Sequence, residues 1–172
     1  MKEKRTALHI SLIAVSAALV AVFTIAVRIP VPATAGYISL CDAAVVFVSY
    51  AFGPFTGLIA GGLGSAFADL LGGYPQFALL SFIVHGLEAL LAGLLVKKNS
   101  QSIPTMIVGA IISIIIVCGG YLLLETLFIT TFSSALVEVP MNALQSGVGA
   151  VVGLLLYTAV RKAYRNLAAI RW

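Results

Sequence analysis

The stretch from Gly36 to Tyr74, GYISLCDAAVVFVSYAFGPFTGLIAGGLGSAFADLLGGY, contains two apolar runs that are joined by Gly53 and Pro54. An aspartate lies in each run, near the end that is farther from this joint: Asp42 in the first and Asp69 in the second. If both runs are membrane helices connected by a tight turn, the two aspartates lie at the same membrane face. The stretch therefore predicts a helix pair with a ligand site at that face.

The composition of the whole chain supports the membrane interpretation. Of 172 residues, 61% are hydrophobic and 9% are charged, and the mean hydropathy is +1.12. Soluble domains carry about 25% charged residues. A water-soluble fold is thereby excluded, and the length predicts a single integral membrane domain over residues 1–172. The net charge of +4 is read as a topology signal and not as evidence for nucleic-acid binding.

Six apolar segments approach the roughly 20 residues that a helix needs to cross a bilayer. They are Leu8–Val27, Leu40–Phe52, Phe55–Leu71, Phe77–Val96, Thr105–Phe128 and Val137–Val160. The first is longer than the core of a signal peptide and is expected to remain as a helix. The second and third are short, so we expect them to tilt or to be shielded by their neighbours. The predicted fold is an all-α membrane protein with six transmembrane helices.

The positive charges predict the orientation, because cytoplasmic loops of membrane proteins carry an excess of lysine and arginine. With six crossings, every lysine and arginine except Arg28 falls on one side of the membrane. These residues are Lys2, Lys4, Arg5, Lys97, Lys98, Arg161, Lys162, Arg165 and Arg171. Both termini are therefore expected to be cytoplasmic.

Acidic residues are distributed in the opposite way. Asp42, Asp69, Glu125 and Glu138 fall in the outer parts of their segments, and Glu88 lies nearer the middle of its segment. Ionisable groups within a bilayer normally face a packed interior or a wet cavity. The acids thus predict a polar chamber that opens to the exterior.

Two external connections are suited to closing such a chamber. The segment from Arg28 to Gly36 contains two prolines, which favour an extended path, and Gly36 is a possible pivot. The turn at residues 72–76 presents Tyr74 at its tip.

Each aspartate has a structural interpretation beside the functional one. Asp42 falls in the first turn of its segment, where a carboxylate caps free backbone N–H groups, and capping is the favoured role. Asp69 falls near the end of a helix, where the helix dipole is unfavourable, so it needs a partner such as Arg28 or a ligand.

His85 and Glu88 are three residues apart and share one helix face. They either fasten helices through a hydrogen bond or form the floor of a pocket, and the pocket is slightly favoured. Tyr121 and Glu125 also share one face, which suits a flat heterocycle with N–H or O–H donors. An interfacial aromatic belt is the alternative for Tyr121.

Glu138, Asn142 and Gln145 form one polar stripe at offsets of zero, four and seven. Hydrogen bonds between helices are the structural alternative, but the stripe is the strongest candidate for ligand contact. Pro140 is expected near the start of this helix, where its missing N–H is tolerated.

Small residues recur on two segments. Gly57 and Gly61 form a GxxxG pair that predicts internal packing. The first segment carries two overlapping AxxxA pairs and few polar groups, so a partner membrane protein is plausible there; the alanines are Ala14, Ala17, Ala18 and Ala21. Walker A, HExxH and GxSxG motifs are absent from the sequence, so uphill transport would need energy from a partner or an ion gradient.

The stretches GYISLCDAAVVF, GPFTGLIAGGLGSAFADLLGGY and FIVHGLEALLAGLL, together with the alanine pairs, resemble the S-components of energy-coupling factor (ECF) vitamin transporters. Within that group the chain is similar to the riboflavin-type branch, which also holds hydroxymethylpyrimidine and pyridoxine carriers. The resemblance covers essentially the whole chain.

The resemblance implies a multi-pass protein of the prokaryotic cell membrane that binds one vitamin with high affinity. It implies docking through the alanine face onto a transmembrane coupling subunit, with ATP used by two cytoplasmic ATPases and no cofactor in the chain itself. The expected ligand contacts combine the resemblance with the residue patterns: His85, Glu88, Tyr121, Glu125, Asn142, Gln145, Asp42 and Tyr74.

Several polar groups and few aromatic ones favour hydroxymethylpyrimidine or pyridoxine as the ligand, with riboflavin as the alternative. The preferred interpretation is a binding subunit without catalytic residues. A membrane-embedded enzyme that uses His85 and Glu88 as acid and base is the alternative from a second class. The single intramembrane histidine argues against a metal site. A purely structural subunit is the third class.

Overall fold

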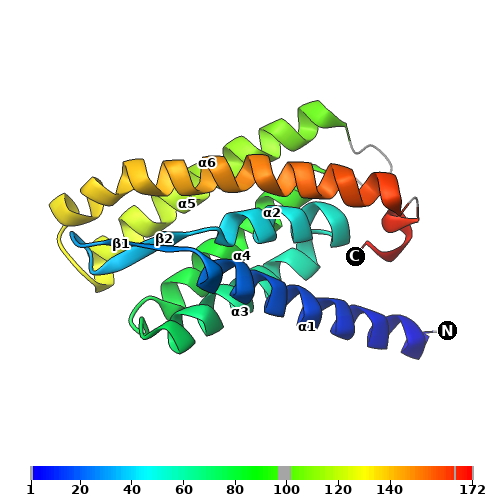
Figure 1. The fold of residues 1–172 in the computed structure, drawn as a ribbon, viewed down its shortest axis with the longest axis horizontal. Coiled ribbons are helices and arrows are strands. Elements are labelled where there is room, and N and C mark those ends of the chain that lie inside the picture. Colours follow the sequence, from blue (N-terminus) through cyan, green and yellow to red (C-terminus); the bar gives the residue numbers. More distant parts are fainter. Residues whose placement is uncertain (1, 97–101, 165, 172) are drawn as a thin grey trace.

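The computed structural model describes residues 2–96, 102–164 and 166–171. These residues form a helical bundle with one short β-hairpin (Figure 1). The elements are α1 (Lys2–Ala26), β1 (Arg28–Val31), β2 (Gly36–Ser39), α2 (Cys41–Phe52), α3 (Pro54–Gly72), α4 (Ala78–Leu95), α5 (Ile103–Phe128), α6 (Phe132–Ala163) and the 3₁₀-helix η1 (Leu167–Ile170). Lys97, Lys98 and Arg165, which entered the topology prediction, lie outside the described residues.

The bundle is elongated and its two ends differ. The N- and C-terminal regions lie at one end, here called the terminal end, and the β1–β2 hairpin lies at the other, the hairpin end (Figure 1). Successive helices run in alternating directions between these ends. Both termini therefore lie on the same side of the bundle, as the six-segment pattern predicts, and their cytoplasmic location remains a prediction.

Helix length separates α2 from the other five helices. Each of α1, α3, α4, α5 and α6 contains an apolar stretch that is long enough to cross a membrane. By contrast, α2 has 12 residues, about 18 Å at 1.5 Å per residue, and is too short to span ~30 Å of hydrocarbon. The six predicted helices are therefore confirmed, and α2 is the short one among them, as its predicted segment Leu40–Phe52 already indicated. This helix is buried from Cys41 to Ala51, which agrees with the expectation that its neighbours shield it.

Glycines allow the helices to approach closely around this buried centre. A Cβ atom added to Gly153 of α6 would lie 2.7 Å from the carbonyl oxygen of Ala43 in α2. A Cβ atom on Gly61 of α3 would lie 2.9 Å from the carbonyl oxygen of His85 in α4. Such contacts leave no room for a side chain, so the expected internal packing of the α3 glycines is confirmed.

The start of α6 differs from the sequence prediction. The helix begins at Phe132, where Thr131 is the N-cap and its hydroxyl accepts a hydrogen bond from the Ser134 N–H at 3.4 Å. The polar first turn explains why hydropathy missed it. Pro140 consequently lies inside α6, and its predicted position near the helix start is wrong.

The external segment after α1 forms a hairpin. β1 and β2 pair antiparallel, with Arg28 opposite Ser39 and Val31 opposite Gly36. The left-handed residue of the turn is Ala35, with φ of 56°, and Gly36 is the first residue of β2; its role as a pivot stays a prediction. A Cβ atom at Gly36 would lie 3.1 Å from the Phe77 ring, a tight contact that the ring would have to relieve by shifting slightly.

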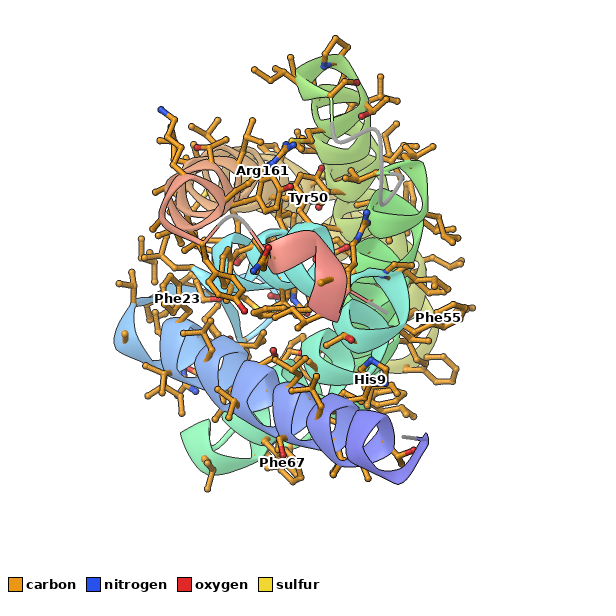
Figure 2. The ribbon with its side chains drawn as sticks, turned by 90° about the vertical axis from the view of Figure 1, so that its right-hand side faces the viewer. His9, Phe23, Tyr50, Phe55, Phe67 and Arg161 are labelled. Carbon is orange, nitrogen blue, oxygen red and sulfur yellow. The ribbon has the colours of Figure 1, made fainter. Side chains whose placement is uncertain are left out.

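The apolar core lies towards the terminal end. Tyr50 and Tyr157 are fully buried, and their rings meet edge to face with centroids 6.1 Å apart. The Tyr50 hydroxyl donates to the Met106 carbonyl at 2.7 Å. In Figure 2, Tyr50 lies inside the bundle, whereas Phe55 and Phe67 lie at its periphery, where both are about half exposed. Outward-facing phenylalanines of this kind suit contact with lipid.

Candidate ligand cavity at the hairpin end

A small polar cavity lies below the hairpin and is lined by the hairpin, by helices α1, α3, α4, α5 and α6, and by Phe77. Every residue of its wall except Phe77 carries a side-chain polar atom. The wall consists of Thr24, Tyr37, Ser39, Ser65, Asp69, Phe77, Ser81, His85, Tyr121, Glu125, Glu138, Asn142 and Gln145. Its free interior is about 20 Å³, which is space for roughly one water molecule.

A cluster of aromatic and charged groups connects the hairpin to the end of α3. The Tyr37 hydroxyl donates a short hydrogen bond to Asp69 Oδ1. Arg28 donates to the Ala68 carbonyl at 2.6 Å, and its guanidinium carbon lies 4.9 Å from the centre of the Tyr37 ring. The Tyr74 ring packs against Tyr37 with centroids 4.7 Å apart. These contacts hold the hairpin over the cavity.

Asp69 therefore has Tyr37 as its direct partner, where Arg28 or a ligand was expected. Burial raises the pKa of the Tyr37 hydroxyl above its ordinary value, and the nearby Asp69 carboxylate raises it further. The hydroxyl consequently remains a hydrogen-bond donor at physiological pH.

A hydrogen-bonded chain joins α4 to α5 at the opposite side of the cavity. His85 Nδ1 lies 2.8 Å from Glu88 Oε2, and the other oxygen of Glu88 accepts a short hydrogen bond from the Ser113 hydroxyl. His85 Nε2 lies 3.2 Å from the Tyr121 hydroxyl, which in turn pairs with Ser81 at 2.7 Å. His85 and Glu88 thus fasten helices, and His85 also forms part of the cavity wall.

Gln145 joins three elements behind the wall. Its Nε2 atom donates to Asp42 Oδ2 at 2.7 Å, and its Oε1 atom accepts from the Ser39 N–H at 2.6 Å. Asp42 lies in the first turn of α2, where its charge complements the helix dipole as predicted. Its carboxylate caps no backbone N–H among the described residues, because Oδ1 has no partner and Oδ2 accepts from Gln145. The amide of Gln145, which comes from α6, provides the hydrogen bond that stabilises this carboxylate.

Glu125 of α5 and Glu138 of α6 are electrostatic neighbours in the cavity wall. Both residues are buried, at 1% and 2% exposure, and the Oε2 atom of each lacks a hydrogen-bond partner within the described residues. Two neighbouring carboxylates repel each other unless a proton or a donor group lies between them. This pair is therefore a ready acceptor site for a ligand that carries N–H or O–H groups.

The structure brings together most, but not all, of the predicted contacts. Five of the eight line the cavity: His85, Tyr121, Glu125, Asn142 and Gln145. Asp42 and Glu88 are fully buried behind the wall, and Tyr74 packs on the outer side of Tyr37.

The sequence analysis missed six wall residues: Thr24, Tyr37, Ser39, Ser65, Ser81 and Phe77. Tyr37 and Ser39 are two residues apart in a strand and so share a face, a signal that was available once the hairpin was recognised. The four others are single hydroxyls or an aromatic ring on apolar helices and gave no pattern.

Taken together, the apolar helices and the polar cavity define a polytopic membrane protein with a candidate site at one end. The family model for the ECF-type riboflavin transporter, S component, matches residues 4–162. The chain belongs to this family, and it is accordingly a multi-pass prokaryotic membrane protein of the vitamin-transporter class. Because the family consists of transporter subunits, the interpretation as a membrane-embedded enzyme is set aside.

Three similar proteins agree with this assignment. A solved structure of the S component of a bacterial ECF transporter has a TM-score of 0.65 at 21% identity, covering 95% of this chain and 98% of its own, which shows the same fold. The thiamine precursor transporter HmpT of Lactococcus lactis is 26% identical over 94% of this chain and 93% of its own length. An uncharacterized protein of Pyrococcus woesei is 37% identical over 59% of this chain and 68% of its own length.

Proposed function

We propose that this S-component binds hydroxymethylpyrimidine, or the similarly sized pyridoxine, in the cavity at the hairpin end. The observation that carries the proposal is the pair of buried carboxyl groups, Glu125 and Glu138, each with an oxygen that has no partner in the described part of the chain. The amino and hydroxymethyl groups of such a pyrimidine supply N–H and O–H donors for these oxygens. Similarity to a thiamine precursor transporter supports the same class of ligand.

The rest of the wall suits a small flat ring. Tyr121, Tyr37 and Phe77 provide aromatic surface, more than the sequence patterns suggested, and Asn142 offers an amide beside the two carboxyl groups. Riboflavin is the second candidate, since the family description names it. Its three-ring system and ribityl chain need far more than the present free volume, whereas a single ring requires a smaller expansion.

Binding requires the cavity to open, because about 20 Å³ does not hold a vitamin. The hairpin is the element placed to move, since it lies over the cavity and the contacts of Tyr37 and Arg28 attach it to the end of α3. We expect it to lift for ligand entry and to close over the bound ring.

The family membership also supports assembly with a transmembrane coupling subunit and two cytoplasmic ATPases, which would use the ATP. Ala14 and Ala18 are exposed on α1 and are available for such docking. Ala17 and Ala21 are half-buried, and Ala17 belongs to the α1–α3 contact, where a Cβ atom on Gly64 would lie 2.5 Å from its carbonyl oxygen. Of the four alanines, Ala14 and Ala18 are therefore the proposed docking pair.

The experiment is an equilibrium titration of the purified protein with hydroxymethylpyrimidine, pyridoxine, thiamine and riboflavin. Ligand that binds only the folded state raises the unfolding free energy by about 2.7 kcal/mol at a hundredfold excess over its dissociation constant. We expect stabilisation by hydroxymethylpyrimidine or pyridoxine and a loss of that effect in Asn142→Ala. Stabilisation by riboflavin alone would contradict the proposed cargo. No stabilisation by any compound would favour a purely structural subunit.

A further inference from the structure

Behind the cavity wall, three buried side chains from two helices converge on one point. Asp42 of α2 and His85 and Glu88 of α4 each offer one ligand atom, and these atoms lie within 4.8 Å of one another. All three residues are at most 3% exposed. The sequence analysis expected no metal site because it considered only the single intramembrane histidine. The fold adds the carboxylate of Asp42, which is distant in sequence.

We propose that Asp42, His85 and Glu88 form a binding site for one divalent metal ion of the zinc class. The donor set is one imidazole nitrogen and two carboxylate oxygens, which zinc, cobalt and related ions accept. Calcium and magnesium prefer oxygen donors alone, so the histidine argues against them.

The charge of the cluster supports a divalent ion. Two carboxylates and a neutral imidazole carry a charge of −2, and one divalent cation brings the total to zero. A neutral site is strongly favoured in the middle of a membrane protein, where an uncompensated charge is costly. No further charged group is needed to bring the net charge of the ion and its three ligands to zero.

Each of the three ligands is also oriented by a second hydrogen bond, as is usual at metal sites. Gln145 donates to Asp42 Oδ2, which leaves Oδ1 buried and without a partner among the described residues. Ser113 donates to one oxygen of Glu88. His85 Nε2 faces the Tyr121 hydroxyl, so that Nδ1 is the nitrogen available to the ion.

The geometry requires only a small adjustment. Ligand atoms around tetrahedral zinc lie about 3.4 Å apart, so a separation of 4.8 Å, the widest that the cluster allows, would contract by about 1.4 Å. His85 Nδ1 and Glu88 Oε2, now 2.8 Å apart, would separate slightly as the ion replaces the proton between them. A bound ion would then fix the His85 ring, and with it one wall of the ligand cavity.

The test uses the full-length protein, purified with an affinity tag that contains no histidine and stripped of metal with a chelator. Titration with Co²⁺ and with Zn²⁺ is expected to show one ion per chain, and the Co²⁺ complex is expected to show visible ligand-field absorption. His85→Gln and Glu88→Gln should weaken binding by at least about tenfold, since even outer-shell changes at metal sites cost 10- to 100-fold.

The matched control is His9→Gln, because His9 is the other histidine of the chain and lies on α1 towards the terminal end (Figure 2). This variant should bind the ion as the wild type does. Equal binding by wild type and His85→Gln, or loss of binding in His9→Gln, would overturn the proposal.

If His85→Gln and Glu88→Gln do not fold, the titration of the metal-free wild type tests the proposed metal site. Stoichiometric Co²⁺ binding with ligand-field absorption that Zn²⁺ displaces would support the site. Absence of binding by the metal-free wild type would overturn it and would mean that protons alone balance the charges of the cluster.

Discussion

At the terminal end of the bundle, buried hydroxyl groups donate to backbone carbonyls, whereas at the hairpin end buried carboxyl oxygens remain unpaired. The hydroxyls of Ser49 and Tyr50 donate to the carbonyls of Ala89 and Met106 at 2.6 and 2.7 Å. The four carboxyl oxygens without a partner in the described chain belong to Asp42, Asp69, Glu125 and Glu138.

This difference separates the residues that stabilise the fold from the residues that are proposed to bind the vitamin. Apolar contact and hydrogen-bonded hydroxyl groups stabilise the terminal end, where the buried atoms without a partner among the described residues are Thr56 Oγ1 and Arg171 Nε. At the hairpin end, unpaired buried carboxyl oxygens cost free energy. Such a cost is commonly found where a protein retains groups for a ligand. Substitutions at the two ends should therefore affect different quantities.

The largest effect on stability is expected from Tyr157→Ala at the terminal end. The variant removes a fully buried ring that packs against Tyr50, and comparable losses of large aromatic residues cost about 3–5 kcal/mol. Thermal unfolding in detergent measures the change. Tyr157→Phe retains the ring and should lose only part of this stability. A weakened vitamin affinity in correctly folded Tyr157→Phe would contradict the separation of the two ends.

For Glu125→Gln at the hairpin end, we expect a loss of vitamin affinity without a loss of stability. This change removes one of the two facing carboxyl groups, so stability should be unchanged or higher. A hydrogen bond to a charged group contributes about 1.5–3 kcal/mol, which corresponds to at least about a tenfold loss of vitamin affinity. Calorimetric titration measures the affinity, and an unchanged dissociation constant would exclude Glu125 from the ligand site.

A smaller effect is expected from Tyr37→Phe, which removes the hydrogen bond to Asp69 but retains the ring packed against Tyr74. One hydrogen bond contributes about 1 kcal/mol, so the vitamin should dissociate about fivefold faster. Stopped-flow displacement measures this rate. Tyr74→Phe is the control, because it retains both the ring contact with Tyr37 and the hydrogen bond between Tyr37 and Asp69. Its dissociation rate should equal that of the wild type. Equal rates in wild type and Tyr37→Phe would mean that this contact does not hold the hairpin closed.

The sequence predicted the helical architecture well because lipid requires long apolar segments, and these are visible without any tertiary information. It located α2 to within one residue and indicated that this helix is short, although hydropathy alone does not show how completely its neighbours bury it. It also missed the start of α6, where the first turn is polar.

The candidate site was predicted only where its residues form a pattern on one helix. The stripe of Glu138, Asn142 and Gln145 was found in this way, and all three residues line the cavity. The role of Asp42 was missed because its partner, Gln145, is 103 residues away in the chain. Local preferences favoured a helix cap, and the tertiary contact determined the outcome.

Hydrogen–deuterium exchange of the purified protein, with and without saturating vitamin, tests most directly the claim that binding occurs at the hairpin end. The informative amides lie in the connections, because membrane helices exchange slowly. We expect the vitamin to slow exchange in residues 28–39, 73–77 and 129–131, and to leave residues 102–104 and 166–170 unchanged. Protection confined to the terminal end, or equal at both ends, would contradict the account.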